Sequence, residues 1–469
     1  MSGAGQEMTA WLLQRASPAP DTEVDIAVRD GRVVDLEDLD EPIEHVVDLE
    51  GRPTLPGLVD HHVHLMSQAA AWDSVDCSPD TLLAEGGLAA VLREARLRRP
   101  DGWIRGIGYD LATSGSLDRL LLDELGVGPV RIQDRTGMYW VLDSPGLARV
   151  LPTAPSEWPP GIFVDGARRP TGVLYRLDGW LRDRLPTRVP DLARVGAWLA
   201  ERGVVAVTDA TVTNGAEDLK ILSQAGLPQR VTAMTSSPDV PAVEGVQLGP
   251  VKIVLDESQL PSSVELWTRI TEAHARGRSV AVHCLDSASV VLAVSCGLHE
   301  RDRVEHASLV GVDVVGLLAR SGVRVVVQPG LVYTRGDRFL QEIEPSEEVD
   351  LYRLASFLAA GITVRLSSDA PYGPLDPWIT VAAAVGRRTV SGRKLNQAEG
   401  VELETALALF TSGDHRRAPA RARVQPDSPA DLIVLDGDWD SLTDHPRVAL
   451  TIVDGVPIHS LIGELAVPP

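Results

Sequence analysis

Short apolar runs recur along the middle of the chain and alternate with segments whose apolar residues have helical spacing. The eight runs occupy 56–64, 203–211, 230–236, 250–256, 279–284, 303–307, 323–329 and 362–370. Helical spacing is found between them, at 192–202, 217–225, 264–276 and 351–360. Eight apolar strands that alternate with helices predict an α/β fold, the parallel (β/α)8 TIM barrel.

One long segment interrupts this alternation. The first run ends at residue 64 and the second begins at 203, so about 138 residues lie between them, far more than one connecting helix needs. The pattern predicts an insertion over about 78–185 that begins with a helix over 81–99. Since barrel enzymes place their active sites in the loops that follow the strands, we expect the insertion to form part of a substrate pocket.

Both ends of the chain have the sequence pattern of short strands joined by tight turns. Residues 22–55 alternate apolar and polar positions around Asp30-Gly31, and the last fifty residues carry a second such turn at Asp454-Gly455. Together they predict a small β-sandwich domain built from both termini. The expected boundaries are 1–55 and 416–469 for this β-domain and 56–415 for the barrel with its insertion.

The amino-acid composition limits the kinds of molecule that the protein is expected to bind. The formal net charge of -22 argues against nucleic acid and anionic membrane, because both favour basic proteins. Three cysteines form an odd number without a disulfide spacing and indicate a reducing compartment. No apolar run is long enough for a signal peptide or a spanning helix, so we expect a cytoplasmic protein. A small-molecule substrate is the expected partner, and a homodimer is left open.

Two histidines lie at the end of the first apolar run. His62 and His64 are two residues apart, so in a strand both side chains point to the same face, while His61 and Val63 point to the other. Two imidazoles on one face can hold a metal ion, although two ordinary polar residues at a strand end would give the same pattern. His61 faces the surrounding helices, and we expect it to have a packing role.

Three further candidates end other runs. His283 ends the fifth run, His306 the sixth and Asp369 the eighth, so their side chains are expected at the same mouth of the barrel as the histidine pair. A lone histidine is more often structural than a ligand, but several positions agree here. Imidazole and carboxylate ligands suit zinc or a similar first-row metal.

Lysine is rare in this chain. Of the 44 basic residues only three are lysine, and one of them, Lys252, lies inside the apolar run 250–256. Burial can depress the pKa of this amine, and a neutral amine can add carbon dioxide to form a carbamate whose oxygens bridge two metals. The alternative is a lysine that snorkels or pairs with Asp256 or Glu257.

These residues resemble the amidohydrolase superfamily. PGLVDHHVHL (56–65) is similar to its first-strand signature, and Lys252, His283, His306 and Asp369 match its ligands from strands four, five, six and eight. PADLIVLD and TIVDGVPI are similar to its C-terminal strands. GWIRGIGYD, PTGVL, VAVHCLD, RVEHA and SSDAP resemble the branch of N-substituted formamide deformylases and N-acyl amino-acid deacylases. The segments RTGMYW and DESQLPSS depart from the pattern, so substrate specificity does not carry over.

The resemblance implies a metal-dependent amidohydrolase that cleaves a C–N bond of an amide, N-acyl or N-formyl type through metal-bound hydroxide. Two divalent ions, expected to be zinc, would lie about 3.5–4 Å apart. His62, His64, the Lys252 carbamate and Asp369 would hold one ion, and the carbamate with His283 and His306 the other. Asp369 would act as the catalytic base and then as the acid.

Two other functions stay open at this stage. The first is a mononuclear deaminase or another C–N hydrolase of the same superfamily, which needs no Lys252, and the second is a non-catalytic scaffold barrel. Several aromatic and basic residues are candidates for substrate binding, although each could instead belong to the core of the insertion or to a solvated loop. They are Trp72, Tyr109, Arg135, Tyr139, Trp140, Tyr333 and Arg335.

Overall fold

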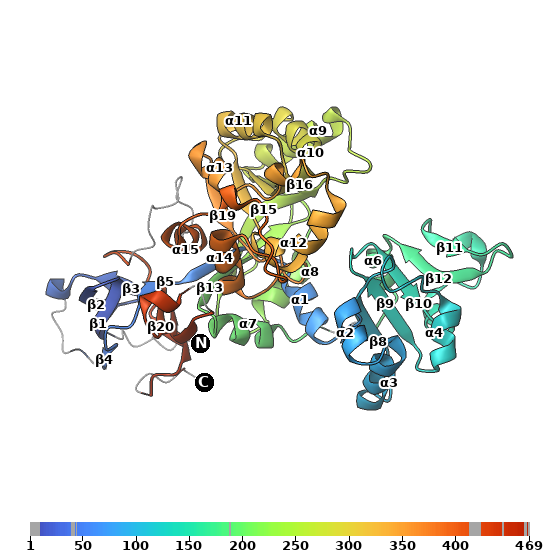
Figure 1. Ribbon diagram of the computed structural model, residues 1–469, viewed down its shortest axis with the longest axis horizontal. Helices are drawn as coiled ribbons and strands as arrows, with labels where there is room; N and C mark the ends of the chain where they lie inside the picture. Colours follow the sequence, from blue (N-terminus) through green and yellow to red (C-terminus); the bar gives the residue numbers. More distant parts are fainter. Residues whose placement is uncertain are drawn as a thin grey trace. The chain divides into compact units, whose positions relative to one another are not determined.

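The computed structural model describes residues 10–38, 43, 45–186, 189–411, 424–442, 445–463 and 467 (Figure 1). The chain divides into two compact units. The barrel unit comprises Met1–Leu65 and Leu192–Pro469, and the insertion unit comprises Met66–Asp191. The insertion expected over 78–185 falls inside the second unit.

An eight-stranded parallel sheet forms the centre of the barrel unit, and it confirms the predicted TIM-barrel fold. Its strands are neighbours in the order in which they occur along the chain, as short right-handed crossovers require. They are β6 (Leu58–Val63), β13 (Val204–Asp209), β14 (Arg230–Thr235), β15 (Val246–Val254), β16 (Val280–Asp286), β17 (Arg303–Leu309), β18 (Arg324–Val327) and β19 (Val364–Leu366).

Hydrogen bonds at the carboxyl end close the barrel between its first and last strands. The main-chain N–H of Asp369 donates to the carbonyl of His62 at 2.8 Å, and the N–H of His64 donates to the carbonyl of Ala370 at 2.9 Å. The carboxylate of Asp60 also accepts the N–H of Ser368 at 3.1 Å. These bonds bring the end of β6 next to the segment that follows β19.

Helices alternate with these strands, as the spacing predicted. α9 shows why: Ser262 and Glu265 form a capping box at its start, and Leu266 and Ile270 face the core. The helices are α7 (Leu192–Ala200), α8 (Ala216–Ser223), α9 (Ser263–Ala275), α10 (Ser287–Ser295), α11 (Val312–Ser321), α12 (Gly330–Glu342), α13 (Ala355–Ala359), α14 (Pro377–Gly386) and α15 (Leu403–Thr411).

Strands from both ends of the chain form two four-stranded sheets, which confirms the small β-domain. One sheet has the order β3-β2-β1-β4 and the other β22-β21-β20-β5. Leu13 and Ile26 of the first sheet share a buried cluster with Leu450 and Ile452 of the second. The strands are β1 (Trp11–Ala19), β2 (Thr22–Arg29), β3 (Arg32–Val34), β4 (His45–Asp48), β5 (Thr54–Pro56), β20 (Leu432–Asp436), β21 (Arg447–Val453) and β22 (Val456–Ser460).

The insertion unit has a six-stranded sheet of its own, in the order β11-β12-β10-β9-β8-β7. Alternate residues of β10 enter different clusters, Val141 on one face and Trp140 and Leu142 on the other, so both faces are covered. The strands are β7 (Val75–Asp76), β8 (Ile104–Tyr109), β9 (Val130–Asp134), β10 (Tyr139–Leu142), β11 (Ile162–Val164) and β12 (Pro170–Tyr175). The helices are α1 (Leu65–Trp72), α2 (Pro79–Ala84), α3 (Leu88–Arg98), α4 (Arg119–Leu125), α5 (Ser144–Val150) and α6 (Asp178–Arg182).

Two sequence predictions of helices are wrong in extent. The single helix expected over 81–99 is two helices, α2 and α3, because Gly86 and Gly87 between them have φ angles of 81° and 97°, which a continuing helix cannot contain. The helix expected over 351–360 is reduced to the five residues of α13.

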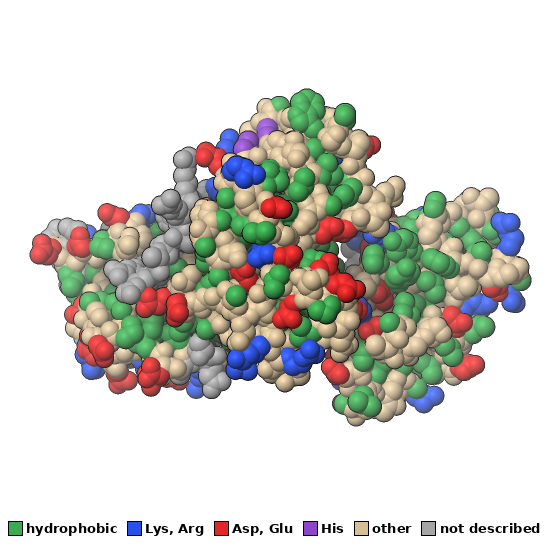
Figure 2. Space-filling model, turned by 45° about the horizontal axis from the view of Figure 1, so that its top comes forward, with side chains coloured by type: hydrophobic (Ala, Val, Ile, Leu, Met, Phe, Trp, Pro, Cys, Tyr) green, Lys and Arg blue, Asp and Glu red, His purple; other side chains and the backbone are tan. Residues whose placement is uncertain are grey.

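Three further features of the described residues concern the cysteines, the helices and the charged surface. All three cysteines are buried and free of disulfides. Among the helices that the structure describes, none combines the length and apolar character that a membrane-crossing segment needs. On the face that Figure 2 draws, acidic and basic side chains are spread among hydrophobic ones.

Gly57, which directly precedes the first barrel strand β6, is closely packed and gives a testable prediction. A Cβ atom on Gly57 would lie 2.2 Å from Cγ1 of Val205 on the neighbouring strand. We expect Gly57→Ala to lower the free energy of unfolding by about 1–3 kcal/mol through overpacking. Gly386→Ala is the control, because no side chain of the described residues beyond its two chain neighbours lies within 4 Å of its added Cβ. Equal unfolding temperatures for the two variants would contradict the prediction.

Candidate metal centre

The first barrel strand ends in polar residues that its alternation places on one face. Asp60 and His62 are both buried, and the Asp60 carboxylate accepts the main-chain N–H of His62 at 3.1 Å. The side chain of His64, the next residue on this face, is 17% exposed. The strand therefore presents two imidazoles at the mouth of the barrel and fixes the first of them by its backbone.

Asp369 completes a compact group with these histidines. Its Oδ1 lies 3.4 Å from Nε2 of His62 and 3.3 Å from Nε2 of His64, and the three ligand atoms lie within 4.8 Å of one another. Asp369 has a φ of 54°, a left-handed conformation that is uncommon for residues other than glycine. Such strained positions concentrate at functional sites.

His283 and His306 lie beside this group. The ring centroids of His306 and His62 are 4.9 Å apart, and those of His283 and His306 are 4.4 Å apart. His306 also has a positive φ, 74°. With His62 and His64, whose ring centroids are 5.3 Å apart, the four predicted histidines form a continuous row of neighbouring rings. The prediction that His283 and His306 end their strands is wrong, because β16 continues to Asp286 and β17 to Leu309.

Lys252 is buried among the same residues. It is 2% exposed, and its Nζ has no hydrogen-bond partner among the described residues. The alternative, a pair with Asp256 or Glu257 or a side chain that reaches water, is therefore not observed. Burial lowers the pKa of the amine, although the charges of Glu305 and Asp369 oppose this effect.

A second unpartnered polar atom lies in the same place, Nε2 of His306. Buried polar groups normally have partners, so two orphaned atoms beside a carboxylate need an explanation. The donors are imidazole nitrogens, a carboxylate and an amine that burial favours as neutral. This set fits a divalent first-row metal, which would supply the missing partners.

Two polar residues that the sequence analysis missed orient the histidines. Nδ1 of His62 lies 2.5 Å from Oε2 of Glu305, and Nδ1 of His306 lies 2.9 Å from Oε1 of Gln328. A carboxylate only accepts, so Nδ1 of His62 carries the proton and its Nε2 keeps a lone pair toward Asp369. Metal-ligating histidines commonly have such partners. The available signal was a buried polar residue inside the apolar runs RVEHA and VRVVVQP.

The pKa shifts of the buried groups favour the binding of a cation at this centre. Burial, followed by the charge of Lys252, lowers the pKa of His62 to about 3, so its imidazole is neutral above that pH. Burial alone would raise the pKa of Glu305, but Arg303 and His62 hold it well below its usual value. The pKa of Asp369 is also lowered, because the hydrogen bond with His64 and the other histidines outweighs its burial. A neutral imidazole of His62 and ionised carboxylates of Glu305 and Asp369 remain.

The open side of the centre carries two further residues that the sequence analysis did not select as site residues. The ring of Tyr372 stands edge-on to His64, with centroids 5.6 Å apart, and Tyr372 is 40% exposed. Oε1 of Glu257 lies 3.9 Å from Nε2 of His283 and accepts the N–H of Leu285 at 3.3 Å. Both positions suit contact with a bound molecule.

The substrate-binding candidates of the barrel unit lie on α12. Arg335 donates to the carbonyl of Tyr372 at 2.6 Å, so it contacts a residue that borders the centre. Tyr333 is half-buried. Their contact with a substrate stays a prediction.

Four of the five candidates of the insertion unit have partners within that unit. The hydroxyl of Tyr109 donates to the carbonyl of Ser114, and Nε1 of Trp140 donates to Asp178. Arg135 pairs with Asp110, the ring of Tyr139 lies beside that of Tyr175, and Trp72 is the last residue of α1. A role of these five residues toward a substrate likewise stays a prediction.

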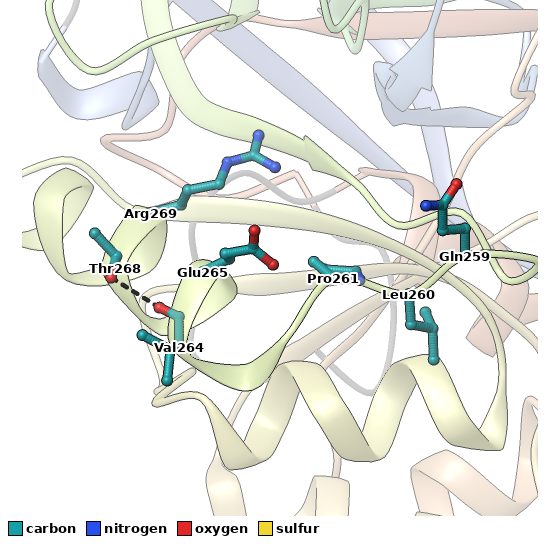
Figure 3. A pocket seen from close by; sticks show the side chains of 7 residues that line it. All are labelled: Gln259, Leu260, Pro261, Val264, Glu265, Thr268 and Arg269. Carbon is teal, nitrogen blue, oxygen red and sulfur yellow. Dashed lines mark hydrogen bonds between the residues drawn. The ribbon is translucent and has the colours of Figure 1, made fainter.

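A separate hollow of about 650 Å³ lies at the start of α9 (Figure 3). Its lining contains none of the histidines or acids of the candidate metal centre. The residues are Gln259, Leu260, Pro261, Val264, Glu265, Thr268 and Arg269. Since it holds no group of the candidate centre, it does not enter the argument on chemistry.

A parallel barrel with metal-ligating residue types at the carboxyl ends of its strands defines the class of metal-dependent barrel hydrolases. The family model for the amidohydrolase family matches residues 45–459. The chain belongs to this family, as its resemblance in sequence indicated.

Relatives agree with this membership. An N-substituted formamide deformylase of Arthrobacter pascens is 26% identical over 487 residues, which cover 88% of this chain and 90% of that protein. The putative amidohydrolase YtcJ of Bacillus subtilis (strain 168) is 23% identical over 468 residues, with 85% and 86% covered.

Solved structures support the fold. An uncharacterized metal-dependent hydrolase of Pyrococcus horikoshii has a TM-score of 0.72 at 22% identity, with 92% of this chain and 98% of that one covered. Another from Pyrococcus furiosus has a TM-score of 0.68 at 23% identity, with 92% and 99% covered.

The orientation of His62 generates a prediction about metal affinity. We expect Glu305→Gln to weaken zinc binding at the centre by roughly 10–100-fold, the usual cost of losing a partner of a metal-ligating histidine. Competition with a chromophoric chelator measures this affinity. The matched control is Glu399→Gln, a buried glutamate that pairs with Arg353 elsewhere in the barrel unit. An equal loss in both variants would mean that Glu305 acts on stability alone.

Proposed function

We propose that this hydrolase cleaves a carbon–nitrogen bond of a small molecule, of the amide, N-acyl or N-formyl type, with divalent metal. The observation that carries the proposal is the meeting of His62, His64 and Asp369 beside the orphaned atoms of Lys252 and His306. The name of the relative from Arthrobacter pascens, an N-substituted formamide deformylase, supports this type of bond.

Zinc is the proposed metal, and two ions are proposed. When bound, a divalent ion supplies a Lewis acid that polarises a carbonyl and lowers the pKa of water. The residues proposed to hold the first ion are His62, His64, Asp369 and carbamylated Lys252. Those proposed for the second are His283, His306 and the same carbamate.

Asp369 is the proposed proton carrier. Its carboxylate lies within 3.4 Å of two histidine nitrogens and is buried, so it can face a water molecule at the same point. In hydrolysis, water adds its oxygen to the carbonyl carbon, and the carbon–nitrogen bond breaks. Asp369 accepts the proton of the water and returns it to the leaving nitrogen, which gives a carboxylic acid and an amine.

The charge near His283 points to uncharged substrates. Glu257 places a carboxyl group 3.9 Å from Nε2 of His283, and burial together with the negative charges of Asp286 and Asp256 raises its pKa. A substrate with its own carboxylate, such as an N-acyl amino acid, meets like charge there. An N-formyl or N-acyl amine without a carboxylate does not, and it is the substrate class that we propose.

This function is tested with the zinc-loaded protein and a panel of N-formyl amines, N-acyl amines and N-acyl amino acids. We expect release of amine from the uncharged amides, its loss on chelation and its return with zinc. Asp369→Asn should lower kcat by at least ~10², while Asp376→Asn, at the start of α14, should not. No amine from any member of the panel would overturn the proposal.

A single-ion deaminase or other C–N hydrolase is the second candidate. It is favoured by one observation: His62, His64 and Asp369 form a close ligand group on their own, and His283 is not part of it. This candidate predicts one metal per chain and an active Lys252→Arg variant. The metal content of active protein therefore separates the two candidates.

Lys252 generates a further prediction. Its neutral amine would bond to the carbon of carbon dioxide and release a proton to solvent, which gives the carbamate. We expect Lys252→Ala to be nearly inactive and partly rescued by a small carboxylic acid with added zinc. Lys252→Arg should not be rescued, because the guanidinium stays charged and occupies the space.

The control for Lys252 is Lys220→Ala, which removes an exposed lysine paired with Glu217 and should keep full activity. A ¹³C NMR signal of a carbamate after exposure of the protein to labelled carbon dioxide is the direct measurement. Its absence in active wild-type protein with two metals bound would contradict the carbamate.

A further inference from the structure

The sheet of the insertion unit carries two arginines side by side. Arg105 on β8 and Arg131 on β9 are register partners in a parallel pair of strands, so their side chains leave the same face of the sheet. Both guanidinium groups lie against the ring of Trp140 on β10, at 5.5 Å and 5.0 Å from its centroid. We call Arg105 and Arg131 the arginine pair. Neither belongs to the residues proposed for hydrolysis.

Arg131 has no partner that compensates its charge directly. Its Nε is buried without a hydrogen-bond partner, and no carboxylate of the described residues forms an ion pair with it. Asp178 acts on Arg131 only from a distance and is itself exposed. An oxygen of Asp178 already accepts Nε1 of Trp140 at 2.8 Å and Nε2 of Gln133 at 3.3 Å. The guanidinium has therefore lost part of its hydration without gaining an acceptor, which is costly.

The neighbouring arginine adds to this cost. Burial, followed by the charge of Arg105, lowers the pKa of Arg131 to about 10, because both effects disfavour its cation. Arg105 donates to two neutral groups, the hydroxyl of Ser74 at 3.0 Å and Oε1 of Gln133 at 3.2 Å. Near neutral pH both guanidinium groups stay protonated, so the two positive charges repel each other.

Stacking on an indole ring explains only part of this arrangement. A single arginine can gain a cation–π contact without a second one beside it. Arg149 of the same unit does so, with an exposed side chain whose guanidinium lies 6.0 Å from the centroid of the Trp103 ring. Stacking accounts neither for two adjacent arginines on one ring nor for the missing acceptor at Nε of Arg131.

We propose that the arginine pair binds a small oxyanion, a carboxylate or a phosphate group, through the guanidinium of Arg131, with Arg105 adding positive charge. A guanidinium presents its N–H donors in a planar fork that matches two oxygens of such a group. Arg131 is half-buried, so a solute can reach the end of its side chain. One negative charge at this place compensates Arg131 and offsets its repulsion from Arg105.

The bound oxyanion stabilises the folded chain, because a ligand that binds only the folded state raises its stability. Without the oxyanion, an unpaired cation beside a like charge opposes folding. Arg131→Met removes that charge and keeps an apolar side chain against Trp140, so in chloride its unfolding temperature should equal or exceed that of the wild type. A role of Arg131 in packing alone predicts a lower unfolding temperature for this variant.

The test measures the unfolding temperature of the full chain in sodium acetate, sodium phosphate and sodium chloride at equal ionic strength. We expect acetate, phosphate or both to raise the unfolding temperature of the wild type above its value in chloride, and to lose this effect in Arg131→Met. A response to acetate alone identifies a carboxylate as the ligand group, and a response to phosphate alone identifies a phosphate group. Arg149→Met, which removes the lone stacked arginine, is the matched control and should respond as the wild type does.

Titration calorimetry with the same ions gives the affinity. We expect it to fall by roughly 10–100-fold in Arg131→Met, the usual range for losing a hydrogen bond to a charged group. Arg131→Lys keeps the charge without the fork and should bind with intermediate affinity. Equal responses of the wild type and Arg131→Met, or no difference among the three salts in the wild type, would overturn the proposal. Since hydrolysis is not measured, this result is independent of the proposed function.

Discussion

Closure of the barrel between β6 and the segment after β19 is the constraint on which the candidate centre depends. Two main-chain hydrogen bonds, from Asp369 to His62 and from His64 to Ala370, join the first strand to the last. The same residues carry the side chains that meet at the centre. Barrel geometry therefore brings together groups that are about 300 residues apart in sequence, and the positive φ of Asp369 is tolerated because its backbone is held on both sides.

Near this closure, the buried carboxylate of Glu305 has charged and polar partners, whereas the buried amine of Lys252 does not. Glu305 is fully buried, but it contacts His62 on one side and Arg303 on the other, so its charge is compensated. Among the described residues, Nζ of Lys252 has no hydrogen-bond partner. A fold that pairs Glu305 on two sides and leaves this buried amine without a hydrogen bond suits a site in which the amine meets a bound group.

The sequence predicted the barrel because alternation and strand length are local properties. Each of the eight apolar runs became a strand, and His62 and His64 share a face because a strand repeats every two residues. The break between α2 and α3 was missed, since the helical pattern on both sides of Gly86 hid the change of backbone direction.

The local sequence pattern could not predict which residues contact the candidate metal ligands. Glu305 contacts His62 across 243 positions of sequence, and Gln328 contacts His306 from the next strand. The register of the strands and the closure of the barrel decide which buried polar residue contacts which histidine. Neither can be derived from the local pattern of apolar residues. Tyr372 reaches His64 for the same reason.

Buried polar atoms at the two ends of the barrel strands differ in whether they have hydrogen-bond partners. Toward the carboxyl ends, Nζ of Lys252 and Nε2 of His306 have no hydrogen-bond partner among the described residues, and this suits a site that binds a further group. At the amino ends, the oxygens of Asp302 are held by two main-chain N–H groups and contact two imidazoles. Side chains fixed in this way add rigidity to the barrel. The two ends of the strands thus differ in how their polar atoms are partnered, and substitutions at one end should leave the other unchanged.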